Sequence, residues 1–261
     1  MIEDSYTHPK TQLVVLQPTP FCNINCRYCY LPNRSSTMRM TMETLARILE
    51  AIFSSPFVAD PLTIAWHAGE PMVLPLSFYH EAYRCIEETN RQGIRVTTTI
   101  QTNGTLITQE WCDFINRHQI NIGVSLDGPP FLHNRSRLDR AGRGTFAQTM
   151  RGVKLLQQNN IEPTILMVLT DDALEYPEEI WQFFTQQNLT RNLSAQGIRI
   201  TTPIPGFQFP SFVGPFSTMD ARVSASQTVF DFSSIRRFQA SKVAIRAARA
   251  DVNGAEEQVA G

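Results

Sequence analysis

The sequence lacks an excess of charge of either sign and lacks long apolar runs, and each absence excludes a class of protein. Its 23 Lys and Arg residues balance 24 Asp and Glu residues to a net charge of -1, which gives no electrostatic basis for binding nucleic acid or an anionic membrane. No apolar run approaches the ~18 residues that span a bilayer. The first ten residues, MIEDSYTHPK, lack the apolar segment of a signal peptide. We therefore expect a cytoplasmic protein that binds neither nucleic acid nor membrane.

Cysteines are also few, and three of the five fall within one short segment. The disulfide framework of a secreted protein uses an even number of cysteines spread along the chain. Here Cys22, Cys26 and Cys29 lie close together, and no cysteine follows Cys112. Three thiols crowded into one loop indicate a metal site instead. Cys85 and Cys112 fall in predicted helices, where we expect them to be small buried hydrophobic residues.

Apolar residues follow two periodicities that alternate along most of the chain. Short apolar or alternating runs predict strands, and apolar residues spaced three or four apart predict helices. The predicted strands are at 12–16, 62–66, 94–100, 120–126, 161–169 and near 197–201, and the predicted helices at 41–53, 77–91, 108–115, 146–156 and 176–183. Strands that alternate with helices are parallel and are joined by crossover helices. The pattern predicts the α/β class, and both an open doubly wound sheet and a barrel satisfy it.

The cysteine segment has the spacing C-x3-C-x2-C and begins just after the first predicted strand, where a parallel sheet presents its ligand-binding loops. An iron–sulfur cubane needs four iron ligands, so three cysteines leave one iron open to bind a cofactor or substrate. A zinc site is the alternative, and structural zinc usually takes four ligands, often from paired C-x2-C units. His8 and Asn33 are the nearest fourth candidates, and no second cysteine pair follows. The spacing favours the cluster and leaves zinc open.

The same segment, FCNINCRYCY, resembles the signature C-x3-C-x-aromatic-C of the radical S-adenosylmethionine (radical SAM) superfamily. The resemblance covers roughly residues 10–187. It implies that Cys22, Cys26 and Cys29 ligate three irons of a 4Fe-4S cluster and that the amino and carboxylate groups of S-adenosylmethionine chelate the fourth iron. Tyr28, in the aromatic position, would lie beside the cofactor.

A second motif follows the second predicted strand, where His-Ala-Gly-Glu-Pro resembles the Gly-Gly-Glu-Pro of the family. In the family, the backbone oxygens of this segment and its Glu receive the ammonium group of the cofactor, which implies that role for Gly69 and Glu70. Ala68 replaces the first glycine, and a small residue still permits close backbone approach. Without the resemblance, Glu-Pro would be an ordinary turn and His67 a packing residue.

Two more motifs follow the third and fourth predicted strands, Thr-Asn-Gly and Ser-Leu-Asp-Gly. The resemblance implies that Asn103, Ser125 and Asp127 bind the cofactor and that Arg137 lies near its ribose and carboxylate. Asn-Gly alone is a generic turn signal, and an arginine alone is ordinarily a surface residue. Because all these motifs lie at carboxyl ends of strands, a parallel barrel would gather them on one face. The resemblance implies a partial (β/α)6 TIM-like barrel.

The residues of these motifs are most similar to those of the SPASM-type subgroup, which includes anaerobic sulfatase-maturating enzymes and cyclophane-forming maturases of ribosomal peptides. The resemblance implies an oxidoreductase that cleaves S-adenosylmethionine reductively to a 5′-deoxyadenosyl radical. That radical would abstract hydrogen from a side chain of a precursor peptide or protein. A one-electron donor such as a flavodoxin or ferredoxin is implied as a partner. The resemblance names neither the peptide nor a catalytic residue beyond the cofactor site.

The chain divides near residue 187. Residues 10–187 carry the motifs and predict the radical SAM core domain, whereas 188–261 lose the strand–helix alternation. SPASM-type members carry a cysteine-rich C-terminal region, and this chain has no cysteine after residue 112. We therefore expect 188–261 to be a divergent or truncated region, in which the last barrel strand could fall. Two other interpretations stay open: a degenerate homologue that binds a cluster or a peptide without turnover, and a zinc-binding interaction module.

Overall fold

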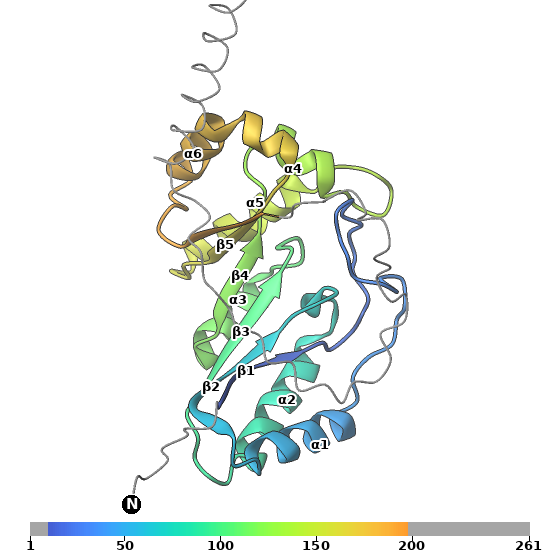
Figure 1. Ribbon diagram of the computed structural model, residues 1–261, viewed down its shortest axis with the longest axis vertical. Coiled ribbons are helices and arrows are strands. Elements are labelled where there is room, and N and C mark those ends of the chain that lie inside the picture. Colours follow the sequence, from blue (N-terminus) through green and yellow to red (C-terminus); the bar gives the residue numbers. More distant parts are fainter. Residues whose placement is uncertain (1–9, 198–261) are drawn as a thin grey trace, which may run out of the picture. The chain divides into compact units, whose positions relative to one another are not determined.

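A six-stranded sheet organises the part of the chain that the computed structural model describes, residues 10–197. Its strands lie in chain order, so each strand's neighbour is the next along the chain (Figure 1). They are β1 (Thr11–Leu16), β2 (Val58–Trp66), β3 (Val96–Thr102), β4 (Asn121–Ser125), β5 (Thr164–Leu169) and β6 (Leu193–Gly197). The registered pairs from β1 to β5 are all parallel. The sheet is the half-barrel expected of a partial TIM-like barrel in the α/β class.

Helices connect the strands, and most lie where the apolar spacing predicts them. They are α1 (Met42–Phe53), α2 (Leu76–Thr89), α3 (Gln109–His118), α4 (Pro130–Ser136), α5 (Phe146–Gln158) and α6 (Pro177–Gln186), with 3-10 turns η1 (Pro71–Val73) and η2 (Asp171–Glu175). Thr41 begins α1 as predicted, because its hydroxyl accepts a hydrogen bond from Thr44 N at 3.1 Å. Thr108 caps α3 in the same way.

Two elements differ from the prediction. Helix α4 was not predicted, because seven residues that follow one proline and begin with another carry too little periodicity to be recognised. Pro130 nevertheless suits the first turn, where a backbone N–H is not needed. Strand β6 begins at Leu193, earlier than predicted, because its alternation is short and weak. It includes the first residue of the predicted range 197–201, and 198–201 lie outside the described residues.

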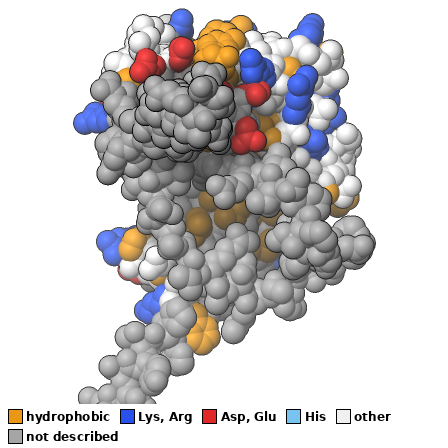
Figure 2. All heavy atoms as spheres, turned by 45° about the horizontal axis from the view of Figure 1, so that its top comes forward, with side chains coloured by type: hydrophobic (Ala, Val, Ile, Leu, Met, Phe, Trp, Pro, Cys, Tyr) orange, Lys and Arg blue, Asp and Glu red, His pale blue; other side chains and the backbone are white. Residues whose placement is uncertain are grey.

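The two faces of the sheet differ in burial. Leu16, Ile64 and Trp66 point toward the helices and are at most 4% exposed, whereas Leu13 and Val15 on the opposite, open face of β1 are 55% and 54% exposed. An aromatic cluster fills the helical side, and in it Tyr79 meets Trp66 edge-on with ring centroids 5.5 Å apart. Figure 2 shows hydrophobic side chains of described residues near the centre of one face, with most of the visible acidic and basic side chains toward its upper part and edges. The helix-covered face supplies the core and leaves the other face of the strands open.

The chain separates into two compact units. The first extends to Val168 and includes Glu178–Ser194, and it carries β1 to β4 with their helices. Of the described residues, the second contains Leu169–Pro177, with η2 capped by Thr170, and 195–197. Most of the predicted C-terminal region, 198–261, lies outside the described residues. Among the helices of residues 10–197, none has the length and apolarity needed to cross a membrane.

Candidate functional site

The loops that carry the predicted site residues leave the sheet at the carboxyl ends of β1 to β4. Such ends meet at one edge of a parallel sheet, and side-chain contacts show that they do so here. Asn103, after β3, donates from Nδ2 to Asn23 Oδ1 in the loop after β1 at 2.8 Å. Asn23 Nδ2 in turn donates to Thr105 Oγ1 at 2.8 Å. The two loops are therefore fastened to each other by amide side chains.

The cysteine loop, residues 22–34, is closed by backbone hydrogen bonds. Cys22 N donates to Arg34 O at 3.2 Å, and Cys29 N donates to Cys26 O at 3.3 Å. All three thiols are free; Cys26 is buried, and Cys22 and Cys29 are half-buried. Within residues 10–197, no three His, Cys, Asp or Glu side chains are placed to hold one metal ion. A cubane makes a different demand, because each thiolate binds its own iron.

Burial governs the protonation of two of these thiols. Burial and the Glu70 carboxylate raise the pKa of Cys22 to about 12, although Asn103 Nδ2, 3.8 Å from the sulfur, favours the thiolate. Burial also raises the pKa of Cys26, against the opposing effect of the Arg137 guanidinium. Both thiols therefore carry protons at neutral pH. A metal that binds them as thiolates must displace those protons.

Gly69 lets the turn after β2 pass against the cysteine loop. Its φ is +66°, and a Cβ there would lie 2.3 Å from Thr19 O and 2.7 Å from Phe21 O. Glu70 N donates to Phe21 O at 2.8 Å, so the two segments are in backbone contact. Glycine is therefore required by both conformation and space. Ala68 shares the left-handed conformation, with a φ of 73°. An alanine is strained there, whereas the glycine that the family has at this position would not be.

Glu70 is a buried carboxylate that ties the end of β2 to the end of β3. Its Oε2 accepts from Asn103 N at 2.7 Å, and its Oε1 accepts from Thr102 Oγ1 at 2.7 Å and Met72 N at 3.0 Å. Burial raises the pKa of Glu70, and these three hydrogen bonds oppose that shift. The side chain points into the protein, since the residue is 1% exposed. A contact with an ammonium group stays a prediction and would use the remaining lone pairs of the carboxylate.

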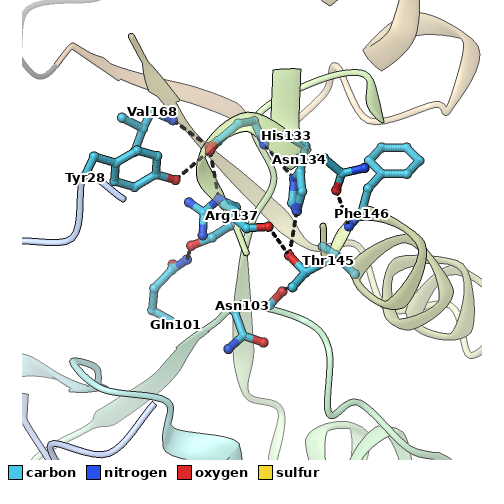
Figure 3. A network of polar contacts seen from close by, with 12 residues as sticks. Tyr28, Gln101, Asn103, His133, Asn134, Arg137, Thr145, Phe146 and Val168 are labelled. Atoms are coloured by element: carbon cyan, nitrogen blue, oxygen red, sulfur yellow. Dashed lines mark hydrogen bonds and ion pairs between the residues drawn. The ribbon is translucent and has the colours of Figure 1, made fainter. Parts of the chain in front are cut away.

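A buried ion pair joins the motif after β4 to the cysteine loop (Figure 3). Arg137 Nε lies 2.9 Å from Asp127 Oδ2, and the two side chains are 7% and 6% exposed. Tyr28 OH donates to the same Oδ2 at 2.6 Å, and Arg137 Cζ lies 5.4 Å from the centre of the Tyr28 ring. Val168 N, on β5, donates to Oδ1 at 3.0 Å. Three predicted site residues, Tyr28, Asp127 and Arg137, are thus in direct contact.

His133 is buried beside the ion pair and forms hydrogen bonds there with Asp127 and Thr145. It was not among the predicted site residues. Asp127 N lies 3.3 Å from His133 Nδ1, and His133 Nε2 lies 3.1 Å from Thr145 Oγ1 (Figure 3). Burial and the Arg137 guanidinium lower the pKa of His133 to about 4, so the ring is neutral at pH 7. Because Nδ1 accepts, the ring proton lies on Nε2 and faces Thr145, whose hydroxyl donates to Arg137 O at 2.9 Å. His133 and Thr145 therefore hold the backbone N of Asp127 and the backbone O of Arg137.

Ser125 contacts Gln101, which the sequence analysis also missed. Gln101 Nε2 donates to Ser125 Oγ at 3.1 Å. Gly123 leaves room for this side chain, because a Cβ at Gly123 would lie 2.1 Å from Gln101 Oε1. The two-residue alternation of the third strand could have found Gln101, since it places this residue on the face opposite Ile100.

The donor set of this edge suits an iron–sulfur cluster with a zwitterionic ligand beside it. The three free thiols supply separate iron ligands. Asn103 lies against the sulfur of Cys22 and the carboxylate of Glu70 at once. The Arg137 guanidinium, paired with Asp127, lies against the Tyr28 ring of the same loop. Both a carboxylate and a guanidinium therefore lie near the cysteine loop, the charge types that the amino and carboxylate groups of such a ligand would need.

The chain matches curated proteins over about two thirds of its length. It is 43% identical over 183 residues to an uncharacterised protein of Synechocystis sp., covering 69% of this chain and 46% of the relative. It is 32% identical over 184 residues to a serine-type anaerobic sulfatase-maturating enzyme of Bacteroides thetaiotaomicron, covering 68% and 44%. A cysteine-type enzyme of Clostridium novyi is 31% identical over 172 residues, covering 64% and 46%. The chain therefore spans about half the length of the curated relatives it matches.

Solved structures share the fold. The anaerobic sulfatase-maturating enzyme anSMEcpe with bound AdoMet superimposes with a TM-score of 0.67 at 25% identity, covering 72% of this chain and 51% of that one. Streptococcus suis SuiB bound to its precursor peptide SuiA gives a TM-score of 0.53 at 20% identity, covering 72% and 39%. This second likeness concerns the fold alone.

The model of the radical SAM superfamily matches residues 16–184. A 4Fe-4S cluster and S-adenosylmethionine are the characteristic cofactors of that superfamily, which confirms the cofactors that the resemblance implied. The sulfatase-maturating relatives support the relation to the SPASM-type subgroup. Its half-barrel, its strand-end motifs and this match together show that the chain belongs to the radical SAM superfamily.

Proposed function

We propose that this chain holds a 4Fe-4S cluster through Cys22, Cys26 and Cys29 and uses S-adenosylmethionine to modify a side chain of a peptide or protein. When bound, these cofactors supply a 5′-deoxyadenosyl radical that can abstract hydrogen from an unactivated C–H bond. The observation that carries the proposal is the meeting of three free thiols with the other strand-end motifs at one edge of the half-barrel.

The residues of the chain have separate tasks in this proposal. Gly69 brings the turn after β2 against the cysteine loop, and Glu70 with Asn103 receives the ammonium end of S-adenosylmethionine. Ser125 ends β4, Asp127 follows that strand, and both hold the other end of the molecule together with Arg137. Tyr28 stays beside the cofactor because its hydroxyl is fixed to Asp127. Residues 10–187 would form the core that carries all these tasks.

The substrate class and the electron donor are part of the proposal. Relatives of this chain mature sulfatases, as their names state, and anSMEcpe was solved with bound AdoMet and the Cp18Cys peptide. We therefore propose a peptide or protein substrate, with a flavodoxin or ferredoxin as the one-electron donor. Because the chain spans about half of its curated relatives, these proposals concern the chemistry of the core.

Anaerobic reconstitution of the full 261-residue chain with iron and sulfide tests the proposal. After chemical reduction, we expect a cluster whose electron paramagnetic resonance spectrum changes on adding S-adenosylmethionine, and the formation of 5′-deoxyadenosine. The triple substitution of Cys22, Cys26 and Cys29 by Ala should abolish both. Cys85→Ser is the matched control, because Cys85 is a free, half-buried thiol on α2 outside the loop.

Each contrary outcome would contradict a different part of the proposal. A cluster that forms but yields no 5′-deoxyadenosine would indicate a degenerate homologue without turnover. Zinc bound in the absence of iron and sulfide would indicate an interaction module. A cluster that survives the triple substitution would refute the assignment of the three ligands.

A further inference from the structure

Arg140 reaches from the segment after α4 to the cysteine loop and binds it at several points. Its Nε and Nη2 donate to Cys22 O at 2.9 and 2.6 Å. Nη2 also donates to Arg34 O, and Nη1 donates to Ser35 Oγ at 3.0 Å. The guanidinium lies over the Phe21 ring, with Cζ 4.8 Å from its centre. One side chain therefore joins the two ends of the cysteine loop.

The turn at 139–143 aims Arg140 at the loop. Asp139 Oδ1 accepts from the backbone N of Ala141 and of Arg143, both at 2.8 Å, which fixes the turn. Gly142 completes it with a φ of +79°. On the other side, Asp139 pairs with Ile24 of the cysteine loop in an isolated antiparallel bridge. Asp139 thus attaches the turn to the cysteine loop, and the next residue, Arg140, joins the two ends of that loop with its side chain.

A second guanidinium acts on the same loop from within. Arg34 Nη1 donates to Cys26 O at 3.1 Å. The backbone O of Arg34 accepts from both Cys22 N and Arg140. Arg140 therefore holds the carbonyl of Cys22, and Arg34 holds the carbonyl of Cys26. Arg140 also contacts Arg34 directly. Charge-assisted hydrogen bonds of this kind are stronger than neutral ones.

We propose that Arg140 is a positioning residue for the cluster: it locks Cys22 and Arg34 together and so keeps the cysteine loop in the conformation that retains iron. The inference rests on the proposed function, since it needs the loop to hold a cluster. Arg140 acts through the two carbonyls and through its positive charge near the loop. The contacts proposed for S-adenosylmethionine lie on other residues.

Three variants of the full chain separate geometry from charge. Arg140→Gln removes the charge and the fork, and Arg140→Lys keeps the charge but loses the planar fork. Arg143→Gln is the matched control, because Arg143 lies in the same turn and its side chain pairs with Asp139. The readouts are iron release to a chelator under anaerobic conditions, the midpoint potential of the cluster, and the unfolding temperature of the apoprotein.

We expect Arg140→Gln to release iron about tenfold faster, the change that one lost charge-assisted hydrogen bond produces. Its midpoint potential should be more negative than that of the natural chain, because a nearby positive charge stabilises the reduced cluster. Arg140→Lys should keep the potential near its natural value while releasing iron faster. Arg143→Gln should match the natural chain in both.

The outcomes distinguish the inference from the function on which it rests. If the natural chain forms no cluster, the proposed function fails and the inference with it. If the natural chain holds a cluster and Arg140→Gln retains iron at the same rate and potential, the inference alone is overturned. Equal losses in Arg140→Gln and Arg143→Gln would also overturn it, because the turn rather than the Arg140 side chain would then be responsible.

Discussion

At the scale of single residues, contacts from several segments converge on the buried pair Asp127–Arg137. Asp127 satisfies Tyr28, Arg137 and Val168 with its two oxygens. Burial is the largest single influence on Arg137 and disfavours its charge, but Asp127, Tyr28 and Cys26 together outweigh it, so the pKa of the guanidinium is raised overall. Each charge is tolerated in the interior because the other is present.

Asp127→Ala should therefore lower the free energy of unfolding of the apoprotein by about 3–5 kcal/mol, the cost of leaving one partner of a buried pair uncompensated. Urea denaturation measures this value. Glu43→Ala is the control, since Glu43 also pairs with an arginine at 2.8 Å but on the surface of α1, and its loss should be within error. Equal costs for the two substitutions would contradict the role of burial.

The neutral His133 gives the stability of the protein a dependence on pH. Its pKa is about 4 in the folded chain, below the ~6.5 of an unfolded histidine. Between these values the unfolded chain binds more protons, so stability is full above pH ~6.5 and falls as the pH is lowered toward 4. The loss should approach ~3 kcal/mol, from 1.36 kcal/mol per pKa unit.

The check is urea denaturation at intervals across that pH range for the natural chain and for His133→Gln, which cannot titrate. Subtracting the two curves removes the contributions of Glu70 and of the remaining histidines. We expect the difference to shrink as the pH falls. A difference that stays constant from pH 7 to pH 4 would show that His133 is not held neutral.

The sequence predicted much of the site at this scale, but not its inner layer. Tyr28, Glu70, Asn103, Asp127 and Arg137 were singled out, and the structure gathers them at one edge of the sheet. His133, Thr145 and Arg140 were not, because single polar residues in a loop or a short helix carry no spacing signal. Their contacts depend on how the segment after α4 folds back onto the cysteine loop, which only the three-dimensional arrangement reveals.

Among the connecting elements, the turn between β2 and η1 is the most constrained. Two consecutive residues, Ala68 and Gly69, are left-handed, with φ of 73° and 66°. Gly69 also has backbone oxygens where a side chain would stand. The turn can therefore hold its position only with minimal side chains.

Gly69→Ala should cost at least ~2 kcal/mol in unfolding free energy, from left-handed strain plus displacement of the cysteine loop. Ala68→Gly should be neutral or slightly stabilising, because it relieves left-handed strain of ~1 kcal/mol that offsets the added freedom of the unfolded chain. Ala46→Gly, in the middle of α1, is the control and should cost ~1 kcal/mol. Thermal and urea unfolding measure all three; a loss at Ala68 as large as at Ala46 would contradict the strain.

The elements themselves could be predicted where they are long and periodic. Helices α1 and α5 and strands β3 and β4 lie within a few residues of their predicted ranges, because their apolar faces pack on one core. Helix α4 and strand β6 are short, so local spacing did not define them. The choice between an open sheet and a half-barrel likewise depended on strand order, which no local pattern contains.

For the molecule as a whole, loading with iron should be coupled to the release of protons. Cys22 and Cys26 carry protons at neutral pH, because burial raises the pKa of both thiols. Binding them as thiolates should release protons from both sites and make the apparent iron affinity rise with pH. Reconstitution monitored with a pH indicator and a competing chelator, from pH 7 to pH 9, measures both quantities. Affinity that is flat over this range would mean that the two thiols are already ionised.

The strand order shown in Figure 1 also bears on the order in which the protein can fold during synthesis. Because neighbours in the sheet are neighbours in the chain, the half-barrel can assemble one strand at a time as the chain emerges. The cysteines, however, are made early, whereas their loop is fastened by Asp127 through Tyr28 and by Arg140 through Cys22. Val168, which holds Asp127, is translated 139 residues after Cys29. During that interval the thiols have no finished loop around them. We therefore expect the loop to retain iron only after β5 has been synthesised.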